Sequence, residues 1–234
     1  MMRLFKKSVR EIGNKNSSIA GMFISRKNEK KSVQFESTLE RDFIYLIEYD
    51  SSVEEYVEQP VTINYFDRTG KHRRYTPDFY VRYKDSDRKD ELIEIKYHKY
   101  LLENSLLLNI KFEAAREFCE NNNLIFKVLT EKDIREKDPI YLKNIIFILG
   151  YRDLFEILET SEYLPDRLSR ELDILINRLS ELGKSPISKL LSSFDFDDWK
   201  SAEYLYYIWY LISKRYVGCN LHQQLNINSL IWVI

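Results

Sequence analysis

The strongest constraint on the fold comes from two alternating segments that a charged turn separates. Residues 78–83 (DFYVRY) and 92–97 (LIEIKY) alternate between two kinds of side chain, and the polar segment 84–91 (KDSDRKDE) lies between them. Alternation with a period of two is typical of a β-strand, and a polar turn between two such runs predicts a hairpin. A β-sheet is therefore expected, with other elements covering its faces.

The rest of the chain predicts one mixed α/β domain and one smaller, mainly helical domain. Apolar spacing and turn residues predict a helix, a strand, a second helix and a further strand around this hairpin, over residues 36–50, 61–66, 105–120 and 124–130. From Pro139 the chain becomes helical and ends in two short strands, an order typical of a winged helix-turn-helix module. We expect an α/β domain over 36–138 and a winged-helix-like domain over 139–234.

Charge is distributed unevenly, although the formal net charge is only -1. Residues 1–35 contain nine basic and two acidic residues, which predicts a basic N-terminal arm. Such an arm can contact DNA phosphates, and the candidates for this contact are Arg26, Lys27, Lys30 and Lys31. The alternative is a solvated tail with no binding role.

Composition excludes several classes of protein. A hydrophobic share of 44% excludes disorder along the whole chain. The two cysteines, Cys119 and Cys219, have no CxxC spacing, which argues against a disulfide framework or a zinc knuckle and for a reducing compartment. No run approaches the roughly 18 apolar residues of a membrane span. We expect a soluble, cytoplasmic protein without a membrane partner.

Charged residues on the predicted hairpin suggest an active site. Along residues 92–97, Glu94 and Lys96 share one face, whereas Ile93 and Ile95 share the other. A hairpin that turns near Asp87 would place Asp78 roughly opposite Lys96 and beside Glu94. Two carboxylates and a lysine would then meet at one end of the strand pair.

This combination suits the hydrolysis of a phosphodiester, in which negative charge builds up on oxygen and a divalent cation stabilises it. Asp78, Glu94 and the backbone carbonyl of Ile95 could bind Mg²⁺, for which Mn²⁺ would substitute. Lys96 could position and deprotonate the attacking water or stabilise the developing charge. The alternative is structural: Asp78 as a turn residue, with Glu94 and Lys96 on a solvated strand face.

Glu40 is a further candidate, on the predicted helix over 36–50. Its spacing from Phe43 and Ile47 turns it toward the edge of the buried side. Residues 37–40 (STLE) also fit a capping box, in which Ser37 and Glu40 satisfy the first amides of the helix. On this segment alone, the capping box is the better interpretation.

Five segments follow one another in a telling order: FESTLERDFIYLIEYD, EEYVEQPVTINY, RRYTPDFYVRY, ELIEIKY and KFEAAREFCENNNLIFKVLTEKDIR. In this order they resemble the N-terminal domain of the TnsA family, the endonuclease subunits of heteromeric cut-and-paste transposases. The resemblance runs from about Ile24 to Arg135, and a winged-helix-like C-terminal domain is also typical of this family.

The resemblance implies a restriction-endonuclease-like (PD-(D/E)xK) fold in which Glu40, Asp78, Glu94 and Lys96 are catalytic. It makes a metal-binding role for Glu40 more plausible than the capping box. It further implies Mg²⁺-dependent cleavage of the 5′ strand at the ends of a transposon, in double-stranded DNA. The expected partners are a TnsB-type DDE transposase and a TnsC-type AAA+ ATPase. The alternatives are a stand-alone restriction or repair nuclease and a non-catalytic docking subunit.

The predicted helix over 199–214 carries six aromatic residues but only two lysines. A helix that reads the major groove usually carries more polar and basic side chains. We therefore expect this helix to pack in the core first, to dock a protein second, and to read DNA third.

Overall fold

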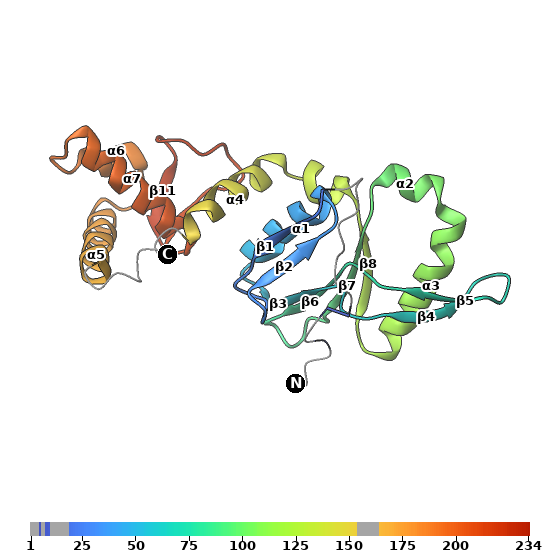
Figure 1. Cartoon of the computed structure of the whole chain (residues 1–234). Helices are drawn as coiled ribbons and strands as arrows, with labels where there is room; N and C mark the ends of the chain where they lie inside the picture. The colour runs from blue at the N-terminus through green and yellow to red at the C-terminus, as the bar shows by residue number, and fades with distance from the viewer. Residues whose placement is uncertain (1–4, 6–7, 10–18, 154–163) are drawn as a thin grey trace. The chain divides into compact units, whose positions relative to one another are not determined.

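The computed structural model describes residues 5, 8–9, 19–153 and 164–234, and it divides the chain into two compact units, Met1–Lys137 and Asp138–Ile234 (Figure 1). Within these ranges, no helix has the length and apolar character that crossing a membrane requires. Part of the predicted basic arm, namely Arg3, Lys6, Lys7, Arg10 and Lys15, lies outside the described residues.

A four-stranded mixed sheet forms the centre of the N-terminal unit. Its strands have the order β3-β6-β7-β8, in which β3, β6 and β7 are antiparallel neighbours and β8 is parallel to β7. Their bounds are β3 (Val53–Glu58), β6 (Phe79–Tyr83), β7 (Glu91–Ile95) and β8 (Ile125–Leu129). The α/β class predicted from the sequence, and its mixed sheet, are confirmed.

A helix and a two-stranded ribbon pack on each face of this sheet (Figure 1). One face is covered by α1 (Thr38–Tyr49) with β1 (Gly21–Ile24) and β2 (Ser32–Phe35). The other is covered by α3 (Ser105–Asn121) with β4 (Ile63–Phe66) and β5 (His72–Tyr75).

Successive side chains of β7 lie on opposite faces of the sheet. Ile93 and Ile95 belong to the core under α1, whereas Leu92 belongs to the core under α3. Because successive side chains of a strand point to opposite faces, Glu94 follows Leu92 onto the α3 face. This alternation determines which elements can reach the Glu94 carboxylate.

Three features of the N-terminal unit differ from the sequence-based expectation. Strand β3 was not predicted, because its sequence, VEEYVE, contains three glutamates. Residues 61–66 do not extend the central sheet, since β4 pairs only with β5 in a separate ribbon. The segment 21–35, expected as part of an arm, forms a hairpin whose Val33 and Phe35 join the core under α1.

Two short helical segments complete the N-terminal unit. They are α2 (His98–Glu103), which follows β7, and the π-helical turn η1 (Lys132–Glu136), which follows β8. In η1, the guanidinium of Arg135 donates to Asp42 of α1 at 2.7 Å, and Ile134 is buried in the core under α1. These contacts attach the end of the unit to α1.

The C-terminal unit contains helices and a three-stranded sheet of order β10-β11-β9. Its elements are α4 (Pro139–Arg152), α5 (Leu164–Leu182), β9 (Ser185–Pro186), α6 (Ile187–Ser192), α7 (Asp198–Ser213), β10 (Val217–Cys219) and β11 (Leu230–Val233). Gly183 directly follows helix α5, and its φ of 66° is a left-handed conformation that glycine adopts without a steric clash.

The aromatic residues of α7 lie mainly in the core of the C-terminal unit. Tyr204, Tyr207, Trp209 and Tyr210 are all buried, whereas Trp199 is 84% exposed. The expectation that this helix uses its aromatic side chains first for packing is confirmed for these four residues.

Candidate active site

The predicted catalytic residues of the hairpin meet at one edge of the central sheet. Asp78 directly precedes β6, and Lys96 directly follows β7. Because β6 and β7 are antiparallel, the start of one strand adjoins the end of the other. The register pairs Phe79 with Ile93, so Asp78 continues the ladder opposite Glu94. The expected pairing with Lys96 is wrong by two positions, because the hairpin is centred one residue earlier than Asp87.

Lys96 holds three oxygen atoms together at this edge. Its Nζ atom lies 3.0 Å from Oε1 of Glu94 and 3.3 Å from Oδ2 of Asp78. It also donates to the carbonyl oxygen of Ile95 at 2.9 Å. These are the three oxygen ligands that the sequence predicts for a metal ion, and they converge on one positive charge.

Asp78 is also positioned by the backbone of β7. Its Oδ2 atom accepts a hydrogen bond of 2.6 Å from the amide of Ile95. Burial, and then the negative charge of Glu94, raise the pKa of Asp78 to about 8, although the Lys96 ammonium lowers it. The Asp78 carboxyl therefore binds a proton near neutral pH when no metal ion is bound.

Glu94 is nearly fully buried, with 1% of its surface exposed, and two residues that the sequence did not predict as site residues contact it. The hydroxyl of Tyr75, on β5, donates to Oε2 at 2.7 Å, and the Lys111 ammonium, on α3, donates to Oε1 at 2.9 Å. Burial and the Glu94 charge raise the pKa of Tyr75, so its hydroxyl keeps its proton. Lys111 lies seventeen positions from Glu94; only the packing of α3 brings it there.

Lys96 remains protonated in this environment. Burial alone would lower its pKa, but the negative charges of Asp78 and Glu94 outweigh burial and raise the pKa above the usual value for lysine. An ammonium group donates hydrogen bonds and cannot accept a proton. In this arrangement, Lys96 is suited to stabilise negative charge.

Glu40 forms a variant of the capping box that its local sequence predicts: Ser37 caps helix α1 as expected, but Glu40 bonds the amide of Glu36 rather than the N-cap amide of Ser37. The Ser37 hydroxyl accepts a hydrogen bond from the Glu40 amide at 3.1 Å and donates to Oε1 of Glu40 at 2.9 Å. Oε2 accepts from the amide of Glu36 at 2.8 Å. Burial raises the pKa of Glu40, and these hydrogen bonds oppose the shift.

Glu40 interacts with Asp78 and Lys96 only through charge. Within the described residues, no hydrogen bond or ion pair joins Glu40 to Asp78, Glu94 or Lys96. Its negative charge nevertheless contributes to the raised pKa of Asp78, and the Lys96 charge lowers its own pKa. Helix α1 covers the opposite sheet face from Glu94, which explains the lack of direct contact.

Gln59 contacts both Asp78 and Glu36, the residue whose amide bonds Glu40. Its amide N–H donates to the carbonyl of Asp78 at 2.8 Å, and its side-chain Nε2 lies 3.4 Å from Oε1 of Glu36. Its φ of 44° is left-handed, which costs energy for a residue with a side chain. The buried Oε1 atom of Gln59 has no hydrogen-bond partner among the described residues.

The four predicted DNA contacts of the arm lie in the turn between β1 and β2. Arg26, Lys30 and Lys31 are exposed there. Lys27 differs from the expectation, because its ammonium donates to the carbonyls of Ile47, at 2.9 Å, and Asp50. A cation at the C-terminal end of a helix is stabilised by the helix dipole, so Lys27 fastens the turn to α1.

The oxygen donors of Asp78, Glu94 and the Ile95 carbonyl fit a hard divalent cation, although only two of these three donors are carboxylates. Across the described ranges, no three His, Cys, Asp or Glu side chains are grouped closely enough to hold a metal ion. Asp78, Glu94 and the Ile95 carbonyl are nevertheless oxygen donors that already converge on a cation, the Lys96 ammonium. Mg²⁺ commonly completes such a partial set with water and substrate phosphate.

Two family models match successive parts of the chain. Residues 50–131 match the model described as "TnsA-like endonuclease N terminal", and residues 136–221 match "TnsA endonuclease C terminal". Together they cover more than two thirds of the sequence. A comparison with curated proteins found no match. Asp78, Glu94 and Lys96 lie inside the first matched range, whereas Glu40 precedes it.

Proposed function

Because the chain belongs to the TnsA endonuclease family, we propose that it cuts the 5′ strand of DNA at each end of a transposon. Membership in the family makes it a DNA endonuclease that acts as a transposase subunit. The proposal adds the strand, the metal and the partners to that statement. We propose Mg²⁺ as the metal, with Mn²⁺ as a substitute, and a TnsB-type DDE transposase and a TnsC-type AAA+ ATPase as partners.

One observation carries the proposal: Asp78, Glu94 and the Ile95 carbonyl converge on a single cation. We assign these three groups as the metal ligands, with Glu40 as a further carboxylate whose charge acts on the same site. A bound Mg²⁺ would supply the Lewis acidity that phosphodiester hydrolysis needs. The alternation along β7 and the turn before β6 support a restriction-endonuclease-like arrangement of these residues.

Lys96 and Lys111 contribute positive charge to the same site. Because Lys96 keeps its proton, we assign it to stabilising the negative charge that builds up on the phosphate oxygens, rather than to accepting a proton from water. Lys111 orients the Glu94 carboxylate from the α3 side. We propose Arg26, Lys30 and Lys31 as contacts to DNA phosphates, and we leave out Lys27 because its ammonium is bound to α1.

We further propose a winged-helix role for the C-terminal unit. Helix α5, strand β9, helices α6 and α7 and the β10-β11 pair follow one another in the order of such a module. The three-stranded sheet, in which β9 pairs with β11, supports this assignment.

The test is strand-specific cleavage of an end-labelled transposon-end duplex with Mg²⁺ or Mn²⁺. The chain is assayed alone and with its cognate transposase and ATPase. We expect a 5′-strand cut only in the full mixture, and we expect Asp78→Asn to abolish it. Asp87→Asn, which changes an exposed carboxylate in the β6–β7 turn, is the matched control and should cut normally.

Two results would contradict the proposal. Cleavage by the chain alone would identify a stand-alone nuclease. Unchanged cutting by Asp78→Asn would leave only a docking role in the transposition complex.

A further inference from the structure

A single arginine side chain joins helix α1 to the end of strand β7. Arg135, in the π-helical turn η1, donates from Nε to Oδ2 of Asp42 at 2.7 Å and from one terminal nitrogen to the Thr38 hydroxyl at 3.0 Å. Its other terminal nitrogen donates to the Tyr97 hydroxyl at 3.2 Å. Tyr97 directly follows the predicted catalytic residue Lys96. One planar guanidinium therefore contacts two segments that carry predicted catalytic residues.

The two contacts of Arg135 on α1 lie on either side of Glu40 in the sequence. Thr38 and Asp42 are four positions apart, and an α-helix has about 3.6 residues per turn. These two residues therefore share one side of α1, whereas Glu40 projects from roughly the opposite side. Arg135 leaves the Glu40 carboxylate accessible and holds the helix at two points about one turn apart. A helix held in this way resists rotation about its axis, so the direction in which Glu40 points is fixed.

Asp42 is the charged partner that binds Arg135 to α1. It is 5% exposed, and a buried carboxylate requires opposite charge and hydrogen bonds. Its Oδ1 atom accepts from Arg41 at 3.0 and 2.8 Å, while Oδ2 accepts from Arg135. Arg41 belongs to α1 itself, and in the described part of the chain it forms no hydrogen bond to Thr38 or Tyr97. Arg41 therefore neutralises Asp42 without joining α1 to another element, which makes it a matched comparison.

The segment around η1 is itself fixed to the edge of the sheet that holds the site. The amide of Lys96 donates to the last carbonyl of β8 at 3.0 Å. The Glu131 carboxylate accepts from the amide of His98, two positions beyond Lys96, at 2.8 Å. Ile134 is 3% exposed and lies in the core under α1. Because η1 has a fixed place relative to Lys96, the bonds of Arg135 give the first turn of α1 a fixed place as well.

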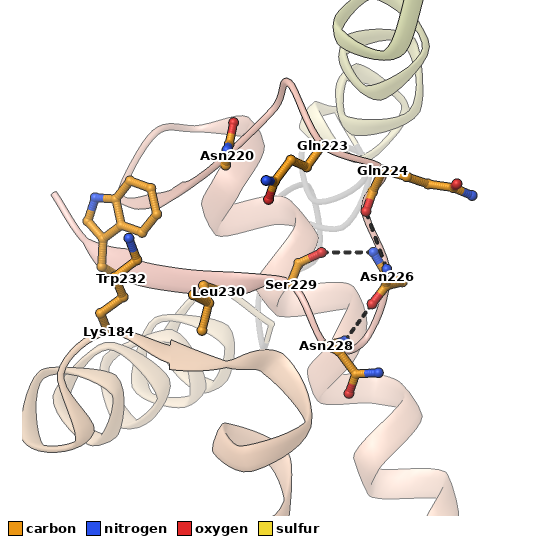
Figure 2. Close-up of a pocket in the computed structure, with 9 residues that line it drawn as sticks. All are labelled: Lys184, Asn220, Gln223, Gln224, Asn226, Asn228, Ser229, Leu230 and Trp232. Carbon is orange, nitrogen blue, oxygen red and sulfur yellow. Dashed lines mark hydrogen bonds between the residues drawn. The ribbon is translucent and has the colours of Figure 1, made fainter.

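The bonds of Arg135 to α1 connect parts of the chain that are far apart in sequence. Arg135 is separated from Asp42 by 93 positions and from Thr38 by 97. Around Asn226 in the C-terminal unit, by contrast, side-chain bonds are local: Asn226 bonds the amide of Asn228, two positions away, and its own amide bonds the Ser229 hydroxyl, three positions away (Figure 2). Local bonds of this kind shape a loop, whereas those of Arg135 set the positions of two elements relative to each other.

We propose that Arg135 is a positioning residue, which holds the first turn of α1, and with it Glu40, at a fixed place beside the end of β7. Among the described residues, no hydrogen bond or ion pair joins Arg135 to Asp78 or Lys96. Arg135 therefore acts through Glu40 and not directly on the reacting atoms. This inference rests on the proposed role of Glu40 in cleavage.

The first test combines variants of Arg135 and Glu40 in the strand-specific cleavage assay, with the cognate transposase and ATPase and saturating Mg²⁺. Arg135→Met should lower the single-turnover rate about 10- to 100-fold, the usual effect of losing a residue that orients a metal ligand. In a Glu40→Gln chain, the same change should lower the rate by less than about a further twofold, because two changes that act through one group are not additive. Arg41→Met removes the guanidinium from the other oxygen of Asp42 and should retain the wild-type rate.

The second test does not depend on cleavage. Hydrogen exchange of the amides of residues 41–43 measures how often the first turn of α1 opens. Arg135→Met should speed this exchange at least about tenfold, whereas Arg41→Met should leave it unchanged. Arg135→Lys keeps a positive charge beside Asp42 and should fold with the wild-type melting temperature. It should still cut at least about threefold more slowly, because one ammonium cannot replace the three-nitrogen fork of a guanidinium.

Equal cleavage rates for Arg135→Met and Arg41→Met would overturn the inference. So would a full additional loss of rate in the Glu40→Gln chain, because Arg135 would then act independently of Glu40. If the wild type does not cut in the full mixture, the proposed function fails, and hydrogen exchange alone decides the inference. Faster exchange in Arg135→Met would then support the positioning role, and unchanged exchange would overturn it.

Discussion

The ammonium group of Lys111 lies 2.9 Å from Oε1 of Glu94, the same oxygen that Lys96 approaches at 3.0 Å. Two ammonium groups therefore contact one carboxylate oxygen, one from the end of β7 and one from α3. The site is not built from the hairpin alone, and α3 takes part in orienting its most deeply buried carboxylate.

Replacing Lys111 should therefore slow cleavage without removing a catalytic group. We expect Lys111→Met to lower the single-turnover cleavage rate about 10- to 100-fold, the usual effect of losing a residue that orients a metal ligand. Arg116→Met removes an exposed cation from the same helix and should retain the wild-type rate. Equal rates for the two variants would show that the Lys111 contact has no role in cleavage.

The raised pKa of Asp78 predicts how stability depends on pH in the metal-free protein. The pKa of an aspartate in the unfolded chain is about 4, whereas the pKa of folded Asp78 is about 8. Between these values the folded state holds a proton that the unfolded chain has lost, so stability must fall as pH rises. We expect the free energy of unfolding to drop by up to about 2 kcal/mol more in the wild type than in Asp78→Asn between about pH 6 and about pH 8. Urea unfolding in a chelator measures this difference, and parallel pH profiles would contradict it.

Glu40 forms a capping box and also interacts by charge with Asp78, and two variants separate these roles. Ser37→Ala removes the cap, which should cost about 1 kcal/mol of stability and leave most of the cleavage activity. Glu40→Gln keeps a side chain that can accept the amide hydrogen bond but removes its charge. We expect it to lower cleavage at least about tenfold, measured with saturating metal. If Glu40→Gln cuts as well as Ser37→Ala does, the capping role is sufficient.

Gln59 combines a left-handed backbone with a side chain that lies near Glu36, and the two features can be tested apart. Gln59→Gly keeps the backbone bond to Asp78 and should stay within about 1 kcal/mol of the wild-type stability, because glycine adopts this φ readily. Gln59→Val should lose about 1–2 kcal/mol, since a β-branched residue is strained there. Both should cut more slowly if the amide group helps to position the site. Chemical denaturation of both variants measures the two stabilities. Full cleavage activity of Gln59→Gly would assign the residue a purely backbone role.

The part of the site that the sequence predicts is the part that depends on local pattern. Alternation along 92–97 is sufficient to place Glu94 and Lys96 on one face, and STLE is sufficient to predict the capping box. Tyr75 and Lys111 were missed because they belong to a separate ribbon and to α3, and only tertiary packing brings them to Glu94.

Strand β3 was missed for a different reason. A run with three glutamates does not indicate a buried strand, yet Glu55 and Glu58 are both buried in it. Arg82, on the neighbouring strand β6, lies 3.3 Å from Glu55 and 3.0 Å from Glu54. The partner that makes burial of Glu55 acceptable is supplied by the pairing of β3 with β6, which no single segment reveals.

The convergence of Asp78, Glu94 and the Ile95 carbonyl on Lys96 also means that the protein carries its own counter-ion. With Lys111, two ammonium groups face the carboxyl groups of Asp78 and Glu94 at this edge, and the proton that Asp78 binds near neutral pH removes the remaining repulsion between the two acidic residues. Such a site does not need an external ion to keep its acidic residues from repelling one another. Folding and metal loading are thereby separated, so the chain can reach its native structure in the absence of metal.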